Sequence, residues 1–143
     1  MNVAGILELK GRDVATATPT DSIESIARNL AALKIGAIVV VEADGSVCGI
    51  VSERDIVRSI ASKGAEALAQ PASELMTRAV VTCAEDETNA KLMEKMTAGR
   101  FRHLPVVASG KLAGIVSIGD VVKARIAEAE AEAEAMRSYI TSA

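Results

Sequence analysis

Two segments with a serine three residues before an aspartate hold the residues best placed for chemistry. They are Ser52-Glu53-Arg54-Asp55 and Ser117-Ile118-Gly119-Asp120, and each follows an apolar run. At a helix start, backbone N–H groups and a serine hydroxyl attract phosphate or carboxylate oxygens. The aspartate could accept hydrogen bonds from two adjacent ribose hydroxyls, and charged hydrogen bonds of this kind contribute roughly 1.5–3 kcal/mol. The pattern therefore indicates a ligand site, but it is equally the pattern of a capping box that only starts a helix.

A cluster of basic residues begins another apolar run. Arg102 and the only histidine, His103, directly precede Leu104-Pro105. Consecutive strand residues point to opposite faces, so Arg102 and His103 cannot serve one ligand from identical positions. For His103 a structural role and a phosphate contact both remain open. Gly119 stands where the other segment has Arg54, which predicts two unequal sites.

Thr16 and Thr82 occupy matching positions at the ends of two short β-like runs. Their neighbours Ala17, Cys83 and Ala84 are small. A flat ring could fit beside such residues. Taken alone, the threonines are ordinary strand residues.

An internal repeat positions these segments. Residues 49–58 recur 65 positions later as residues 114–123, and upstream the copies correspond at a spacing of 66, as in Val14 with Val80. The length change falls in a turn, where loops tolerate it. Each copy has about 60 residues and is too small to bury much core alone. We therefore expect the two copies to pack together.

Hydrophobic patterns predict the order β-α-β-β-α in each copy and a mixed α/β chain of the α+β class. We expect two repeats packed sheet to sheet with pseudo-twofold symmetry. A helix that Asp21 and Glu24 start is expected to reach about Lys34 and to end at Gly36, and Ser73–Thr77 is expected to form a helical turn. The remaining predicted elements are strands at 14–18, 37–41, 47–51, 80–83, 101–107 and 112–116, and helices at 55–62, at 87–97 and from Ile118. The predicted domains are repeat 1 at 6–62, a linker at 63–72, repeat 2 at 73–126 and a helical tail at 127–143.

The tail alternates alanine and glutamate between Ile126 and Met136. A period of two is typical of a strand, but alanine and glutamate favour helix and disfavour strand. We therefore predict a helical extension. Met136 and Ile140 lie four residues apart near its end, and two interpretations stay open, a solvated extension and a helix that pairs in a dimer.

Composition excludes several classes of function. A net charge of −3 and the presence of only two aromatic residues, Phe101 and Tyr139, argue against nucleic acid as a partner. No apolar stretch approaches the roughly 20 residues that a membrane span needs, and the N-terminus lacks a leader pattern, so we expect a cytoplasmic protein. Cys48 and Cys83 form no metal-type pair, which fits a reducing compartment. The sequence has no nucleophile motif, metal-ligand cluster or phosphate loop, so no catalytic activity is expected.

These features resemble a tandem pair of cystathionine-β-synthase (CBS) domains, the Bateman module, over about residues 6–126. The resemblance is carried by the two Gly-Ile-Val-Ser segments that begin at Gly49 and Gly114, by Thr16 and Thr82, and by Arg-His-Leu-Pro-Val at 102–106. The flanking residues are similar to those of stand-alone bacterial CBS pairs. The family implies a flat homodimer and an adenosine-containing ligand in the cleft between repeats, such as AMP, ADP, ATP, NAD(H) or S-adenosylmethionine.

The resemblance also implies roles for individual residues. Asp55 and Asp120 would hold ribose hydroxyls. The phosphates would meet Ser52, Ser117, Arg54, Arg102 and His103. The adenine slots would be lined by Thr16, Thr82, Ala37, Ile38, Leu104 and Pro105. Gly119 departs from the basic residue at Arg54.

Three functions follow from this reading. The leading hypothesis is a non-catalytic sensor of energy state or metabolites that binds an adenine nucleotide and regulates an unknown protein. The second is a ligand-free homodimeric scaffold in which Ser-x-x-Asp only caps helices. The third, less favoured, is a nucleotide-processing enzyme that uses His103 and an acidic residue.

Overall fold

The computed structural model describes residues 1–142 and divides them into two units. Residues 13–81 and 107–113 form one unit, and residues 1–12, 82–106 and 114 onward form the other. We call them the first-copy unit and the second-copy unit, because each holds the Ser-x-x-Asp segment of that copy. Helices and strands are mixed in both, so the predicted α+β class is confirmed. The packing of the repeats sheet to sheet with pseudo-twofold symmetry stays a prediction.

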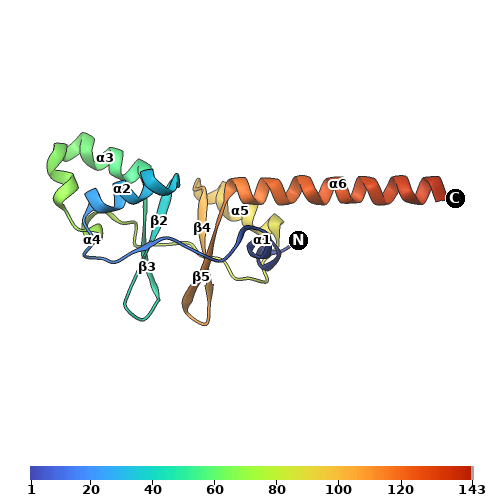
Figure 1. Ribbon diagram of the computed structural model, residues 1–143, viewed down its shortest axis with the longest axis horizontal. Coiled ribbons are helices and arrows are strands. Elements are labelled where there is room, and N and C mark those ends of the chain that lie inside the picture. The colour runs from blue at the N-terminus through green and yellow to red at the C-terminus, as the bar shows by residue number, and fades with distance from the viewer. Residues whose placement is uncertain (143) are drawn as a thin grey trace. The chain divides into compact units, whose positions relative to one another are not determined.

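The first-copy unit is built on a three-stranded sheet in the order β1-β2-β3. Strand β1 (Thr16–Ala17) runs parallel to β2 (Ala37–Val41), and β2 pairs antiparallel with β3 (Val47–Ser52). Helices α2 (Ile23–Leu33) and α3 (Glu53–Lys63) lie beside each other in this unit (Figure 1). Apolar side chains from both helices and from β2 and β3 share one core, which includes Ile23, Ile26, Leu30, Ile38, Val40, Val51 and Ile56.

The second-copy unit contains helices α1 (Val3–Lys10) and α5 (Asn89–Gly99) and the long helix α6 (Ile118–Ser142). Its strands β4 (His103–Ala108) and β5 (Lys111–Ser117) form a two-stranded sheet. Residues 107–113, around the turn between these strands, are assigned to the first-copy unit. The predicted strand at 80–83 is wrong. Only Cys83 pairs there, in a single parallel bridge to Val106, while the Thr82 carbonyl accepts a hydrogen bond from Lys95 Nζ at 2.9 Å.

Several helix boundaries differ from the predictions because local hydrogen bonds decide them. Ser22, not Asp21, caps α2, since its Oγ accepts from Ser25 N at 3.1 Å, while Asp21 accepts from Thr18 N. The predicted end near Lys34 is confirmed, since α2 runs to Leu33 and Lys34 is its C-cap; the left-handed φ of 55° at Lys34, and not Gly36, closes the helix. Arg100 has the same φ and closes α5, which begins at Asn89 rather than 87.

The connection between the copies is more regular than predicted. It contains a 3-10 helix, η1 (Gly64–Ala69), followed by α4 (Ala72–Leu75) near the expected helical turn. The sequence did not predict α1, whose N-terminus is capped by Asn2. Helix α3 starts at Glu53, two residues before the predicted start, because Ser52 is its N-cap.

The glycine that begins each repeated segment is required by close packing. A Cβ at Gly114 would lie 2.8 Å from Leu7 Cδ2 of α1, and a Cβ at Gly49 would collide with the side chain of Met76. In the second-copy unit α1 thus packs against Gly114 of β5, and in the first-copy unit Met76, just past α4, packs against the equivalent Gly49 of β3. Beyond this contact, Lys10 at the end of α1 reaches Asp120, and Thr77, just past α4, pairs with Ile50.

Helix α6 confirms the predicted helical extension and rejects the strand pattern. Val121 and Ala124 are buried near its start, whereas every residue from 129 to 142 is exposed. In Figure 1 the red second half of α6 continues as one unbroken helix to the described C-terminal end.

Candidate functional site

Ser52 and Asp55 form a complete capping box at the junction of β3 and α3. Ser52 Oγ accepts from Asp55 N at 3.2 Å, and Ser52 N donates to Asp55 Oδ2 at 2.9 Å. The Ser52 hydroxyl also donates to Oδ2 at 2.9 Å. A complete capping box therefore starts α3 in the first copy. Capping does not use the whole carboxylate, because both hydrogen bonds from Ser52 to this side chain reach Oδ2.

Ser117 and Asp120 repeat this arrangement at the junction of β5 and α6. Ser117 N donates to Asp120 Oδ2 at 2.8 Å, and Ser117 Oγ accepts from Asp120 N at 3.2 Å. Ser117 N and Lys10 Nζ both donate to Oδ2 of Asp120. Both junctions thus hold an aspartate that is fixed through Oδ2 beside a helix N-terminus.

Lys10 makes the second junction different from the first. Its ammonium lies 2.5 Å from Asp120 Oδ2 and also donates to the Ile115 carbonyl at 3.0 Å. At the repeat spacing of 66, the residue that corresponds to Lys10 is Met76. The first copy therefore has an apolar side chain where the second has a cation.

Burial and hydrogen bonding act in opposite directions on Asp120. Burial alone would raise the pKa of its carboxyl, but the hydrogen bond from Lys10, the backbone N–H of Ser117 and the charge of Lys10 together lower the pKa below its usual value. The carboxylate is therefore ionised at neutral pH. It is also partly neutralised by the adjacent ammonium.

In each copy a backbone hydrogen bond joins the junction to the residue just before β2 or β4. Glu53 N donates to the Gly36 carbonyl at 2.9 Å in the first copy, and Ile118 N donates to the Arg102 carbonyl at 2.8 Å in the second. Ala37 lies directly opposite Ser52 in the antiparallel ladder. The structure thus brings Arg102 to the second junction, whereas Gly36 occupies the matching place in the first.

The predicted adenine-lining residues lie within the same units as their junctions. Thr16 pairs with Val39 in the sheet that also contains Ala37, and Cys83 N, next to Thr82, donates to the Pro105 carbonyl at 3.0 Å. Their exposure differs. Thr16 is exposed and Thr82 is half-buried, whereas the side chains of Ala37, Ile38, Leu104 and Pro105 are buried.

The predicted phosphate contacts are more accessible. Arg54 and Arg102 are exposed, and His103 is half-buried at the first position of β4. Gly119 is exposed in the first turn of α6, and a Cβ there would meet only Ser117 Oγ, at 3.6 Å. The two junctions therefore differ in charge at two positions, at Arg54 and Gly119 as predicted from the sequence, and also at Lys10 and Met76.

Sequence reasoning did not identify Lys10. The sequence did contain a difference between the copies at this position. When the two copies are aligned, the charged Lys10 of one corresponds to the apolar Met76 of the other. Without α1 among the predicted elements, nothing connected Lys10 to a segment more than a hundred residues away.

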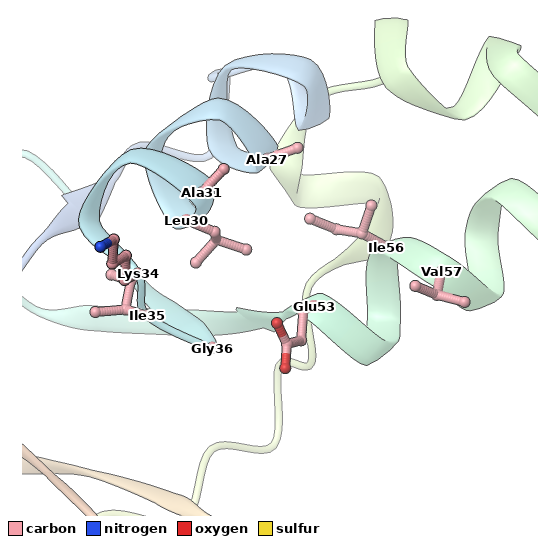
Figure 2. A pocket seen from close by; sticks show the side chains of 9 residues that line it. All are labelled: Ala27, Leu30, Ala31, Lys34, Ile35, Gly36, Glu53, Ile56 and Val57. Carbon is pink, nitrogen blue, oxygen red and sulfur yellow. The ribbon is translucent and has the colours of Figure 1, made fainter.

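A groove of about 490 Å³ between α2 and α3 was also not predicted. Figure 2 shows Leu30 of α2 and Ile56 of α3 projecting into the space between the helices. Lys34 and Glu53 are the charged residues that line it. Nearby, Leu33, Val57 and Ile60 are exposed apolar side chains of the same two helices.

Within residues 1–142, no group of three or more His, Cys, Asp or Glu side chains could hold a metal ion. None of the helices described in this range has the length and apolar character that crossing a membrane requires.

Known proteins share both the repeat and the fold. The family model of the CBS domain matches twice, at residues 6–62 and 72–127. The crystal structure of the CBS-domain containing protein ATU1752 from Agrobacterium tumefaciens is 54% identical, with a TM-score of 0.84 over 87% of this chain and 99% of that one. The CBS domain pair of protein MJ0100, solved in complex with 5-methylthioadenosine and S-adenosyl-L-methionine, is 27% identical, with a TM-score of 0.79 over 90% of this chain and 98% of that one.

A curated relative from Arabidopsis thaliana, the mitochondrial CBS domain-containing protein CBSX3, is 28% identical over 96% of this chain and 71% of its own length. The chain spans only 20% of the next two curated relatives, which are much longer proteins. Both repeats are matched by one family model, and the fold is shared with solved domain pairs. The chain therefore belongs to the CBS domain family and contains a tandem pair of its domains.

Proposed function

We propose that this CBS pair is a non-catalytic regulatory module that binds an adenosine-containing ligand at its two Ser-x-x-Asp junctions. The ligand class is AMP, ADP, ATP or NAD(H). The bound and free forms would then act on a regulated protein whose identity the chain does not reveal.

One observation carries the proposal. In both copies the hydrogen bonds of the capping box reach Oδ2 of the aspartate and fix its carboxylate next to a helix N-terminus. A carboxylate held in this way offers an acceptor to ribose hydroxyls, and the helix N-terminus attracts phosphate oxygens. The adenosine compounds bound by the MJ0100 pair support the same ligand class.

Each residue then has a defined role. Asp55 and Asp120 accept from ribose hydroxyls, while Arg54, Arg102 and His103 approach phosphates. The Ser52 hydroxyl, which donates to Asp55 Oδ2 in the free chain, would have to turn from that oxygen to reach a phosphate. Thr16 and Thr82, with the backbone beside Ala37, Ile38, Leu104 and Pro105, would border the adenine.

The two junctions are expected to bind with different strength. Lys10 partly neutralises Asp120, which weakens that carboxylate as an acceptor for hydroxyls. In the first copy Met76 stands at the position of Lys10, and Arg54 lies beside Asp55 in the sequence. We therefore assign the tighter site to the first copy.

We also propose a homodimer. The groove between α2 and α3 and the exposed side chains of Leu33, Val57 and Ile60 form an apolar surface on one pair of helices. Such a surface suits a second copy of the same domain. The free thiols of Cys48 and Cys83 are consistent with a cytoplasmic location, which we propose as well.

The complete capping boxes favour one competing function, a scaffold that binds no ligand. Native mass spectrometry of the freshly purified full chain separates the two. The sensor is expected to retain, or take up on addition of AMP, ATP or NADH, one or two ligands per chain. An unchanged protein mass with all three ligands at millimolar concentration would support the scaffold and reject the sensor.

The same incubations test for an enzyme. A regulatory module is expected to return AMP, ATP and NADH chemically intact after hours with the protein. Turnover that is abolished by His103→Ala would instead identify a nucleotide-processing enzyme and reject the non-catalytic assignment.

A further inference from the structure

Helix α6 carries a line of apolar residues at coiled-coil spacing. The members are separated by four, three, four, three and four positions, namely Val122, Ile126, Ala129, Ala133, Met136 and Ile140. This alternation is that of the a and d positions of a heptad repeat. We call these six residues the α6 seam.

The α6 seam faces away from the unit to which α6 belongs. Val121 and Ala124 are buried, but Val122 and Ile126 are 42% and 53% exposed, and Met136 and Ile140 are 63% and 68% exposed. From residue 129 to 142 all sides of the helix are exposed. Alanine and glutamate explain why this segment is helical, but they do not explain large apolar residues aligned on one face.

The composition of the α6 seam suits another helix. Ala129 and Ala133 are small and allow a facing backbone to approach closely, while larger side chains flank them on both sides along the helix. A membrane surface would instead favour a wide apolar face bordered by lysine and arginine. Here glutamates predominate between residues 128 and 134.

The charges that flank the α6 seam select the orientation of the partner. With Ile126, Ala133 and Ile140 at a positions, Arg125 and Glu132 are g positions, and Glu130 and Arg137 are e positions. In a parallel pair, a g residue faces the e residue five positions later on the other helix. Arg125 then faces Glu130, and Glu132 faces Arg137, so each contact joins opposite charges.

An antiparallel pair with full overlap gives the opposite result. There e positions face e positions, so Glu130 meets its own copy and Lys123 meets Arg137, while Glu132 at g also meets its own copy. Like charges in such contacts are destabilising. Charge complementarity therefore favours parallel helices in register.

The arginines are available for these contacts. In the single chain Arg125 pairs with Glu128 at 3.4 Å and Arg137 with Glu134 at 3.1 Å, both within α6. Exposed pairs of this kind contribute little to stability. Exchanging them for contacts across the α6 seam therefore costs little.

We propose that α6 pairs, over residues 122–140, with the same helix of a second copy of this chain, as a parallel, in-register, two-stranded coiled coil along the α6 seam. The inference rests on the proposed homodimer for its second copy. To that homodimer it adds a surface, an orientation and a register.

Disulfide trapping of the full chain tests the orientation. In the parallel pair the two Met136 side chains face each other, so Met136→Cys is expected to form a covalent dimer under mild oxidation. Glu134→Cys is the matched control, because residue 134 lies outside the α6 seam on the same exposed turn. The unmodified chain, with Cys48 and Cys83, gives the background. Equal trapping at both positions, or none at Met136→Cys, would overturn the proposal.

Charge reversal at Arg137 gives a second test, because it should weaken self-association of parallel helices and strengthen self-association of antiparallel helices. Arg137→Glu places like charges against Glu132 in the parallel pair and is expected to weaken self-association about three- to tenfold by analytical ultracentrifugation. In the antiparallel pair it would face Lys123 and strengthen association, which would contradict the proposal. Glu134→Gln removes the same intrahelical ion pair and should leave the dissociation constant unchanged.

Sedimentation also tests the homodimer and the coiled coil separately. A dimer that persists while Met136→Cys fails to cross-link would keep the homodimer and reject the coiled coil. A monomer at all concentrations would reject both.

Discussion

Lys10 Nζ lies 2.5 Å from Oδ2 of Asp120 and joins α1 to the junction between β5 and α6. The corresponding contact does not exist in the first copy, because Met76 stands at the position equivalent to Lys10 and packs against Gly49. The two candidate sites therefore differ in charge before any ligand arrives.

The ion pair should stabilise the fold in a pH-dependent way. We expect Lys10→Met to lower the free energy of unfolding by about 0.5–1 kcal/mol at pH 7. Because the pKa of Asp120 is lower in the folded chain than in the unfolded one, this stabilisation is present above the unfolded pKa of about 4 and is lost as the pH falls through the folded value. Urea unfolding of both proteins between pH 7 and pH 3 should show their difference shrinking. Arg28→Met, which removes an exposed pair with Glu24, serves as the control. A difference that stays constant with pH would argue against the ion pair as its source.

Removing Lys10 should also strengthen the second site for a ligand without phosphate. In an Asp55→Ala background only the second junction retains its aspartate, so calorimetry with adenosine measures that site. We expect Lys10→Met to tighten adenosine binding about two- to tenfold, since Asp120 then keeps its full charge for ribose hydroxyls. Equal or weaker binding would show that Lys10 does not compete with the ligand.

Gly119→Arg should give the second site the charge that Arg54 gives the first. The Cβ at this position has room, and the backbone is not left-handed. Affinity for AMP should rise relative to adenosine, because the added charge acts on phosphate alone. Gly119→Ala is the control, since it shares the gain in helix propensity of up to about 1 kcal/mol without adding charge. Identical AMP-to-adenosine ratios in the two variants would place residue 119 away from the phosphate.

The two cysteines should react at different rates. Burial, and next the charge of Glu87, raises the pKa of Cys83 to about 12, so almost none of it is thiolate at pH 8. Burial also raises the pKa of Cys48, but this residue is only half-buried. A colorimetric disulfide reagent should therefore label Cys48 first and Cys83 only after unfolding. Equal rates in the folded protein would contradict the burial of Cys83.

The sequence predicted those elements whose signals are local. The repeat of Gly-Ile-Val-Ser identified both junctions, and the alanine and glutamate content of the tail outweighed its period of two. Both candidate aspartates were located in this way, because a strand followed by Ser-x-x-Asp defines its own geometry.

Features that depend on packing were predicted less well. Instead of the strand expected at 80–83, the structure has one bridge between Cys83 and Val106 of β4. Strand pairing depends on the partner strand and not only on the residue types at 80–83. The end of α2 near Lys34 was predicted, but Lys34 itself as the residue that closes it was not, because propensity disfavours a left-handed backbone at a lysine. Lys10 was missed because its partner, Asp120, is distant in the sequence.

Calorimetric titration of AMP into the full chain, Asp55→Ala and Asp120→Ala tests the central claim most directly. Ser22→Ala controls for the loss of a helix cap, since Ser22 caps α2 without contributing a carboxylate. We predict two unequal binding events in the parent, loss of the tighter one in Asp55→Ala, loss of the weaker one in Asp120→Ala, and both retained in Ser22→Ala. Unchanged affinities in both aspartate variants would contradict the assignment of the sites.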